Sequence, residues 1–165
     1  AVVSTAMRGV GKFGGRPYAP LNSAIIRIFN TYGPRMRPDD GRVVPEFCRK
    51  ALAEEPLILH GGGHQTRSFC FVLDLVEGIY KIYESGAREV FNLGNPSERS
   101  IREFAETVVR LAQSRSKIIE GESRPDDPKR RCPDIGRVRN ALGWTPRVDL
   151  EEGLRRTLEF FREGR

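Results

Sequence analysis

The chain has 165 residues, 38% of them hydrophobic, which is enough to form one core. It contains no apolar run of about 18 residues, so we expect a cytoplasmic protein without membrane contact. Three cysteines without C-x-x-C spacing and two histidines in a glycine-rich stretch indicate neither a disulfide framework nor a metal site. The formal net charge is +6, and residues 124–147 are the most basic segment. No aromatic side chains interleave its basic residues between 124 and 139, so no nucleic-acid partner is predicted.

The first part of the chain predicts a short strand followed by a loop and a helix. Residues 1–23 form a basic opening rich in glycine and proline. The run of β-branched residues at 24–29 is bounded by turn formers and predicts a buried strand. A long loop over residues 32–41 follows. Apolar residues on one helical face between Val44 and Leu52 then predict a helix that ends before a proline.

The middle of the chain predicts two strands, a helix and a third strand. Residues 57–60 and 68–72 are strand candidates on either side of a glycine run. Leu73, Val76, Tyr80 and Tyr83 then recur at helical spacing, and that helix ends at Ser85-Gly86. Residues 90–94 predict the next strand.

Helix caps dominate the last third of the chain. Ser100 and Glu103 form a capping-box pattern that predicts a helix, and Asp149 caps a terminal helix in the same way. Asp134 is expected to cap a short helix that ends near Gly143. Because strands and helices alternate, the predicted class is α/β, with a small sheet and flanking helices rather than a full doubly wound sheet.

Gly9, Gly11 and Gly14 match the G-x-G-x-x-G pattern of dinucleotide-binding loops. Pro17 and Pro20 prevent the helix whose N-terminus would meet a pyrophosphate, and no acidic residue follows at the distance that holds a ribose. We therefore interpret this stretch as a basic opening and not as a dinucleotide site.

A polar strand end is the most specific motif. The segment RIFNTYGPR at residues 27–35 places Asn30 and Thr31 where open α/β sheets bind ligands. Here the chain resembles the extended short-chain dehydrogenases that act on nucleotide sugars, the NAD-dependent epimerase/dehydratase family. The resemblance continues, in family order, through residues 40–47, 61–69, 72–78, 92–96, 126–134 and 142–146.

The resemblance implies a function and a set of partners. The blocks DGRVV at residues 40–44, QTR at 65–67 and DDPKRRCPD at 126–134 look most like those of UDP-glucuronate decarboxylases. Such enzymes oxidise UDP-glucuronate at C4 with NAD, release CO2 from the β-keto acid, and return the hydride to give UDP-xylose. A UDP-sugar partner, NAD as the cofactor and a possible homodimer follow from the family, with residues 24–165 as the C-terminal, substrate-binding domain.

The family also implies roles for individual residues. Arg131 is the candidate catalytic residue. The positions that match substrate-binding residues are Asn30, Val43, Gln65 and Arg67. The positions that match residues near the nicotinamide end of NAD are Thr31, Arg37 and Arg42. Short polar groups and arginines on a strand-end loop suit phosphates and ribose, which agrees with these roles in chemical type.

We expect different roles for Arg67 and Arg131. Arg67 follows three glycines, which allow close backbone approach, and its guanidinium can form two bonds to a diphosphate. Arg131 matches the arginine that faces the sugar in decarboxylating members. Because an arginine pKa lies above about 12, orienting a carboxylate or stabilising an enolate is easier for it than proton donation. Lys129 and Arg130 are expected to be solvated.

Departures from the family limit the expected activity. No Tyr-x-x-x-Lys pair is present, since Tyr18 is followed four residues later by Asn22, and His60 stands where the family usually has tyrosine. We therefore expect the chain to be inactive alone. The alternatives are a fragment of an NAD-dependent sugar epimerase or dTDP-glucose 4,6-dehydratase, a non-catalytic nucleotide-sugar-binding module, and a basic nucleic-acid binder.

Overall fold

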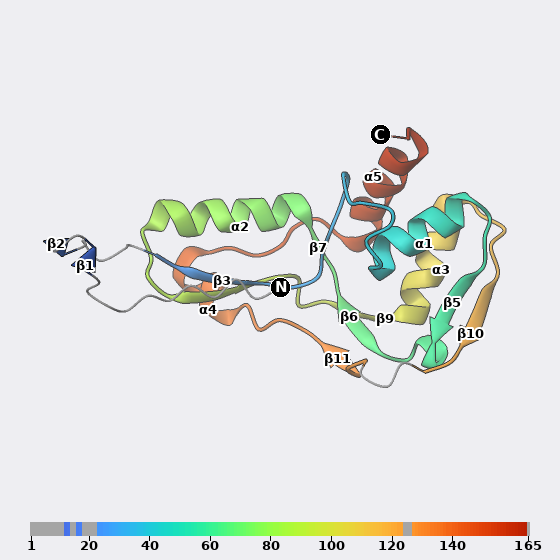
Figure 1. Cartoon of the computed structure of the whole chain (residues 1–165), viewed down its shortest axis with the longest axis horizontal. Helices are drawn as coiled ribbons and strands as arrows, with labels where there is room; N and C mark the ends of the chain where they lie inside the picture. Colours follow the sequence, from blue (N-terminus) through green and yellow to red (C-terminus); the bar gives the residue numbers. More distant parts are fainter. Residues whose placement is uncertain (1–11, 14–15, 18–22, 124–126, 165) are drawn as a thin grey trace.

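The computed structural model describes residues 12–13, 16–17, 23–123 and 127–164. Gly9, Gly11, Gly14, Tyr18 and Asn22, which were weighed as parts of a cofactor or catalytic motif, lie outside the described residues. The described part is mixed α/β, which confirms the predicted class (Figure 1). None of its helices combines the length and the apolar character needed to cross a bilayer.

The helices follow the predicted positions closely. In the described residues they are α1 (Val43–Leu52), η1 (Gly61–Gly63, a 3-10 turn), α2 (Val72–Ser85), α3 (Ile101–Ala112), α4 (Gly136–Leu142) and α5 (Leu150–Arg162). The capping box of α3 is confirmed, because the Ser100 hydroxyl accepts from the Glu103 backbone N–H and the Glu103 carboxylate accepts from that of Ser100. Asp149 caps α5 through the Glu152 N–H.

The strands are short and form several small sheets where one was predicted. β3 (Ile25–Ile28) pairs in parallel with β8 (Val90–Leu93), β4 (Thr31–Tyr32) with β7 (Cys70–Phe71), and β5 (Leu57–His60) with β10 (Ile118–Gly121). A three-stranded sheet has β6 (Thr66–Ser68) between antiparallel β9 (Glu98–Ser100) and parallel β11 (Arg130–Arg131). β1 (Lys12–Phe13) and β2 (Arg16–Pro17) pair antiparallel.

Two sequence-based expectations need correction. The strand predicted at residues 68–72 is divided: Ser68 ends β6, and Cys70 and Phe71 form β7. Phe69 lies between them and stacks on Phe104 with ring centroids 4.4 Å apart, and Val72 already begins α2. Asp134 lies one residue before the N-cap of α4, which is Ile135, although its carboxylate accepts from the Gly136 N–H.

The apolar residues that recur at helical spacing in α2 lie on its exposed side. Leu73, Val76, Tyr80 and Tyr83 are all more than half exposed. The buried side of this helix carries Asp74, Leu75, Gly78 and Ile82. Periodicity therefore located the helix correctly, and the structure identifies its buried face.

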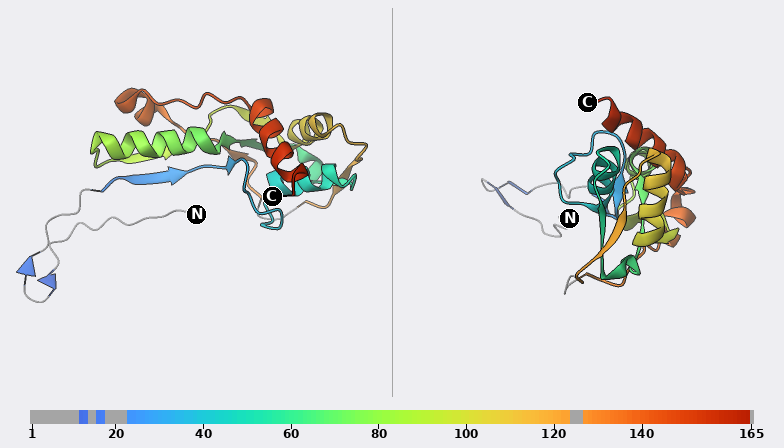
Figure 2. Two further views of the ribbon diagram at one scale, coloured as in Figure 1. Left: turned by 90° about the horizontal axis from the view of Figure 1, so that it is seen from above. Right: turned by 90° about the vertical axis from the view of Figure 1, so that its right-hand side faces the viewer.

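Two clusters of buried apolar side chains lie at the two ends of the elongated molecule (Figures 1 and 2). One fills the space between α1, α3 and α5, and its largest members include Phe47, Phe69, Phe104 and Leu158. The other lies where α2 and α4 cover β8, around Trp144. The three-stranded sheet lies between the two ends, and one side of it borders the candidate site.

A buried carboxylate organises the second cluster. Asp74 accepts hydrogen bonds from the backbone N–H groups of Arg147 and Val148, at 3.1 and 2.9 Å, and its backbone oxygen accepts from the Trp144 indole at 3.0 Å. Two blocks of the family resemblance, residues 72–78 and 142–146, thus meet in a packing role.

Candidate functional site

A cavity of about 580 Å³ opens between the β3–β4 region, the start of α1, and β5 and β6. It is large enough for a small-molecule ligand. Six of the eight residues proposed for binding or catalysis line it: Asn30, Thr31, Arg42, Val43, Gln65 and Arg67. Asn30 and Arg67 are brought to the same cavity because β4, which begins directly after Asn30, pairs with β7, which begins three residues after Arg67.

Arg67 is the best-buried polar feature of the cavity. The residue is 6% exposed although it carries a full charge. Its Nη1 donates to the Thr66 carbonyl at 2.7 Å, and its Nη2 forms an ion pair with the Asp127 carboxylate. Gln65 contacts the same carboxylate, since its Nε2 donates to Asp127 Oδ2 at 3.1 Å and to the His60 carbonyl at 3.1 Å. Arg67 and Gln65 therefore share the Asp127 carboxylate as an acceptor.

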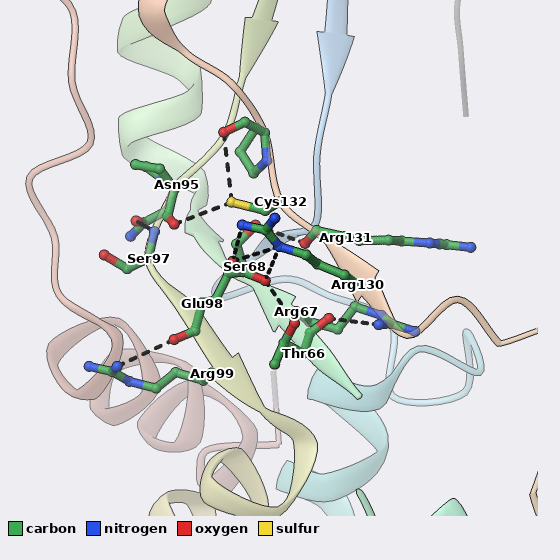
Figure 3. A network of polar contacts seen from close by, with 12 residues as sticks. Thr66, Arg67, Ser68, Asn95, Ser97, Glu98, Arg99, Arg130, Arg131 and Cys132 are labelled. Carbon is green, nitrogen blue, oxygen red and sulfur yellow. Dashed lines mark hydrogen bonds and ion pairs between the residues drawn. The ribbon is translucent and has the colours of Figure 1, made fainter. Parts of the chain in front are cut away.

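Arg131 lies beside Arg67 but outside the cavity lining. The parallel pairing of β11 and β6 puts Arg131 directly in register with Arg67. In Figure 3 both side chains extend from the same side of the sheet, whereas Arg130 turns to the other side. Arg131 is exposed. Its position one strand away from Arg67, about 4.8 Å, is close enough for both to contact one ligand.

Arg130 takes part in a polar cluster instead of being merely solvated. Its guanidinium donates to the Glu98 carboxylate over distances of 2.6 to 3.0 Å, and the Thr66 hydroxyl donates to Glu98 at 2.7 Å (Figure 3). The hydrogen bonds from Arg130, followed by that from Thr66, lower the pKa of Glu98 from its usual 4.5 to about 2. Glu98 thereby joins all three strands of this sheet.

The residues proposed to bind NAD are divided between the cavity and the surface. The Thr31 hydroxyl donates to the Phe29 carbonyl at 2.8 Å, which leaves its oxygen able to accept. Arg42 lines the cavity while its Nε donates to Asp40 at 2.6 Å. Arg37 does not line it; its side chain is 80% exposed and pairs with Asp39.

The backbone conformation of the glycine run before Arg67 explains why glycines occur there. Gly61, Gly62 and Gly63 have φ values of 61°, 72° and 71°, in the left-handed region that other residues rarely adopt. A Cβ on Gly63 would also lie 3.0 Å from the Arg102 backbone nitrogen. None of the three lines the cavity formed by the described residues, so turn geometry accounts for them without a ligand.

The cavity contains residues that motif reasoning did not select. Asp127 is the most important, and its signal was present in the DDP block at residues 126–128, from which only Arg131 was chosen. His60, noted only as a departure, also lines the wall, and its Nδ1 lies 2.9 Å from the Glu122 carbonyl. Apolar members such as Met36 and Phe69 carried no signal in the sequence beyond hydrophobicity.

One tyrosine of the described residues lies next to the cavity lining in sequence. Tyr32 directly follows Thr31, but it is 1% exposed, its hydroxyl donates to the Leu150 carbonyl at 3.2 Å, and burial raises its pKa far above the usual value. It therefore stays protonated and is unsuited to act as a base. Among the described residues no group of three or more His, Cys, Asp or Glu side chains is placed to hold a metal ion. The arrangement is suited to binding anions.

Comparisons with known proteins agree with this geometry. The sequence model of the family described as GDP-mannose 4,6 dehydratase matches residues 16–157. UDP-glucuronic acid decarboxylase 6 of Arabidopsis thaliana is 49% identical over 138 residues, which are 84% of this chain and 40% of that protein. The chain thus spans about two fifths of the length of this curated relative.

Solved structures show the same fold. UDP-glucose 4-epimerase of Thermotoga maritima, determined with UDP-glucose, superposes with a TM-score of 0.82 at 30% identity over 86% of this chain and 46% of that one. UDP-glucuronic acid 4-epimerase of Bacillus cereus, in complex with UDP-glucuronic acid and NAD, superposes with a TM-score of 0.79 at 28% identity over the same shares. The chain belongs to the GDP-mannose 4,6 dehydratase family, among the NAD-dependent epimerases and dehydratases of the extended short-chain dehydrogenase type.

Proposed function

We propose that this chain is the nucleotide-sugar-binding part of an NAD-dependent enzyme that converts UDP-glucuronate to UDP-xylose. The observation that carries the proposal is the buried guanidinium of Arg67 in a ligand-sized cavity, in a chain 49% identical to a UDP-glucuronic acid decarboxylase. Two structural neighbours were solved with UDP-sugars, which supports the same ligand class.

Arg67 is the proposed diphosphate-binding residue. Its guanidinium is held in a fixed orientation by the Thr66 carbonyl, and planar guanidinium groups bind phosphate oxygens in pairs. Gln65 adds an amide donor beside it, and Asn30 offers a further amide in the same cavity. Val43, at the first position of α1, supplies apolar surface to the same ligand.

Arg131 is the proposed partner of the sugar carboxylate. The register of β11 and β6 places it about 4.8 Å along the sheet from Arg67, and UDP-glucuronate carries its carboxylate a short distance from its diphosphate. Because a guanidinium does not readily give up a proton, Arg131 orients the carboxylate and stabilises the electron pair left by departing CO2.

The residues present fit one end of NAD only in part. Thr31 and Arg42 line the cavity and can bind ribose or phosphate oxygens, whereas Arg37 reaches solvent. When bound, NAD would accept a hydride from the sugar and later return it. The chain lacks a Tyr-x-x-x-Lys pair, so we propose no proton-transfer step within it. A cytoplasmic location and a homodimer stay predictions.

An NAD-dependent sugar epimerase is the second candidate. The observation that favours it is the close superposition on two UDP-sugar 4-epimerases, together with the exposed position of Arg131 outside the cavity. Both candidates use a UDP-sugar and Arg67. They differ in whether a carboxylate-binding residue is needed.

Titration calorimetry with UDP, UDP-glucose and UDP-glucuronate tests the proposal. Arg67→Ala should weaken UDP binding by about tenfold or more, because a charge-assisted guanidinium–phosphate pair contributes roughly 1.5 to 3 kcal/mol. Arg131→Ala should leave UDP binding unchanged and remove any preference for UDP-glucuronate over UDP-glucose.

Arg137→Ala is the matched control, since Arg137 is an exposed arginine on α4 that pairs with Glu89. It should change neither affinity nor preference. A preference for UDP-glucuronate that survives in Arg131→Ala would favour the epimerase, and unchanged UDP affinity in Arg67→Ala would reject both candidates. A nucleic-acid binder would ignore all three ligands and bind oligonucleotides with steep salt dependence.

A further inference from the structure

Arg67 needs an anion whether or not a ligand is present. Arg67 and Asp74 are the buried charged residues of the described part, and a buried charge is costly unless it is paired and hydrogen-bonded. The Asp127 carboxylate supplies that partner for Arg67. Asp127 lies 60 residues further along the chain, so the pair exists only through the fold.

The carboxylate takes up the donors proposed for the ligand. Asp127 Oδ1 contacts Arg67 Nη2, and Asp127 Oδ2 accepts from Gln65 Nε2 at 3.1 Å. A phosphate group has the same charge sign and the same kind of acceptor oxygens. The contacts of Asp127 are therefore those that a phosphate would need in order to bind between Gln65 and Arg67.

We propose that Asp127 is an internal competitor for this anion site, which a nucleotide diphosphate must displace in order to bind. The inference rests on the proposed function and adds a residue that determines affinity and selectivity. A carboxylate and a phosphate cannot share one guanidinium without mutual repulsion, so the aspartate side chain turns away as the ligand enters. Neutral sugars lack the charge to displace it.

The positions of the two side chains suit such an exchange. The Arg67 side chain is 7% exposed and stays in place through its bond to the Thr66 carbonyl. The Asp127 side chain is 33% exposed, so it can rotate into solvent and regain hydration. The fixed partner is thus the cation, and the mobile partner is the anion.

Asp127→Asn is the direct test, because it keeps the size of the side chain and removes its charge. UDP affinity, measured by titration calorimetry at low salt, should rise by about fivefold or more, since a competing charged hydrogen bond is lost. The melting temperature without ligand should fall, because Arg67 is then buried without its counter-charge. A residue with a purely structural role would lower the melting temperature without raising UDP affinity.

Glu120→Gln is the control for net charge. Glu120 is an exposed carboxylate that pairs with Arg102 and does not line the cavity of the described residues. This variant should gain far less affinity for UDP than Asp127→Asn. Equal gains would reduce the effect to general electrostatics and overturn the proposal, as would unchanged or weaker UDP binding in Asp127→Asn.

The wild-type chain gives a second measurement that needs no variant. On saturation with UDP, the NMR signals of the Asp127 carboxylate carbon and the Gln65 side-chain amide should both shift, because their mutual hydrogen bond breaks. An Asp127 signal unmoved with UDP bound would contradict displacement. If UDP binding depends on Arg67 but Asp127 does not compete, only this inference fails; if UDP binds none of the proteins, the proposed function fails with it.

Discussion

Glu98 shows how one side chain holds the sheet beside the candidate site. It lies on β9, accepts from Thr66 on β6, and accepts from Arg130 on β11. β11 has only two residues. The contact between Arg130 and Glu98 therefore helps to keep the neighbouring Arg131 in register with Arg67. A surface ion pair is often worth little, but here one carboxylate binds two strands at once.

Glu98→Gln should therefore change how stability depends on pH. The folded-state pKa of Glu98, about 2, lies below its usual 4.5, so its stabilising contribution is fully present above about pH 4.5 and disappears as the pH falls towards 2. Urea unfolding of both proteins across this range should show a difference in free energy of unfolding that is constant above pH 4.5 and shrinks below it.

Arg130→Gln serves as the companion variant, since it removes the largest cause of the lowered pKa. It should reduce the pH dependence in the same window. A difference between wild type and Glu98→Gln that stays the same from neutral pH down to about pH 2 would contradict this explanation.

At the scale of elements, a glycine lets α5 pack closely against strands β4 and β7. Gly153 is buried in α5, and a Cβ built there would overlap the Tyr32 hydroxyl and lie 2.9 Å from the Phe71 ring. Tyr32 and Phe71 belong to the paired strands β4 and β7. The close approach lets the Tyr32 hydroxyl reach the Leu150 carbonyl in the same helix.

Gly153→Ala should destabilise the protein by about 1 to 3 kcal/mol through overpacking, despite the better helix propensity of alanine. Tyr32→Phe removes the overlapping oxygen, so the double variant should lose less stability than the sum of the two single changes. Chemical denaturation of the four proteins measures this coupling. Strict additivity, or a Gly153→Ala variant as stable as wild type, would show that α5 can shift at no cost.

At the scale of the whole molecule, the chain matches about two fifths of a curated decarboxylase, and α2 carries an exposed apolar side. Thr31 and Arg42, proposed for NAD, line the cavity that holds Arg67, whereas Arg37 lies outside it. The residues proposed to bind the diphosphate thus lie together, whereas those proposed for NAD are divided, and the chain has no Tyr-x-x-x-Lys pair.

The purified 165-residue chain should accordingly form no UDP-xylose from UDP-glucuronate and NAD, because none of its four tyrosines is followed by lysine at the required spacing. Product analysis by chromatography is the measurement, with the full-length Arabidopsis relative as the positive control. Detection of UDP-xylose with this chain alone would sink the prediction, and would mean that a proton-transfer group exists elsewhere in it.

Local signals were enough for much of the fold and the site. The capping residues Ser100 and Asp149 located α3 and α5, because a cap depends on residues three positions apart. The family blocks selected Asn30, Gln65 and Arg67, which do line one cavity. These features depend on short sequence spacing or on resemblance, so they could be read without coordinates.

Other features depended on contacts between distant segments. The buried side of α2 could not be identified from periodicity, because Leu75 and Ile82 pack against elements that periodicity does not reveal. The partner of Arg67 was missed for the same reason, since pairing over 60 residues is set by how β11 docks on β6. The sequence by itself thus determined which residues carry the chemistry. Only the tertiary structure decided which charges meet, because burial and strand register are properties of the packed chain.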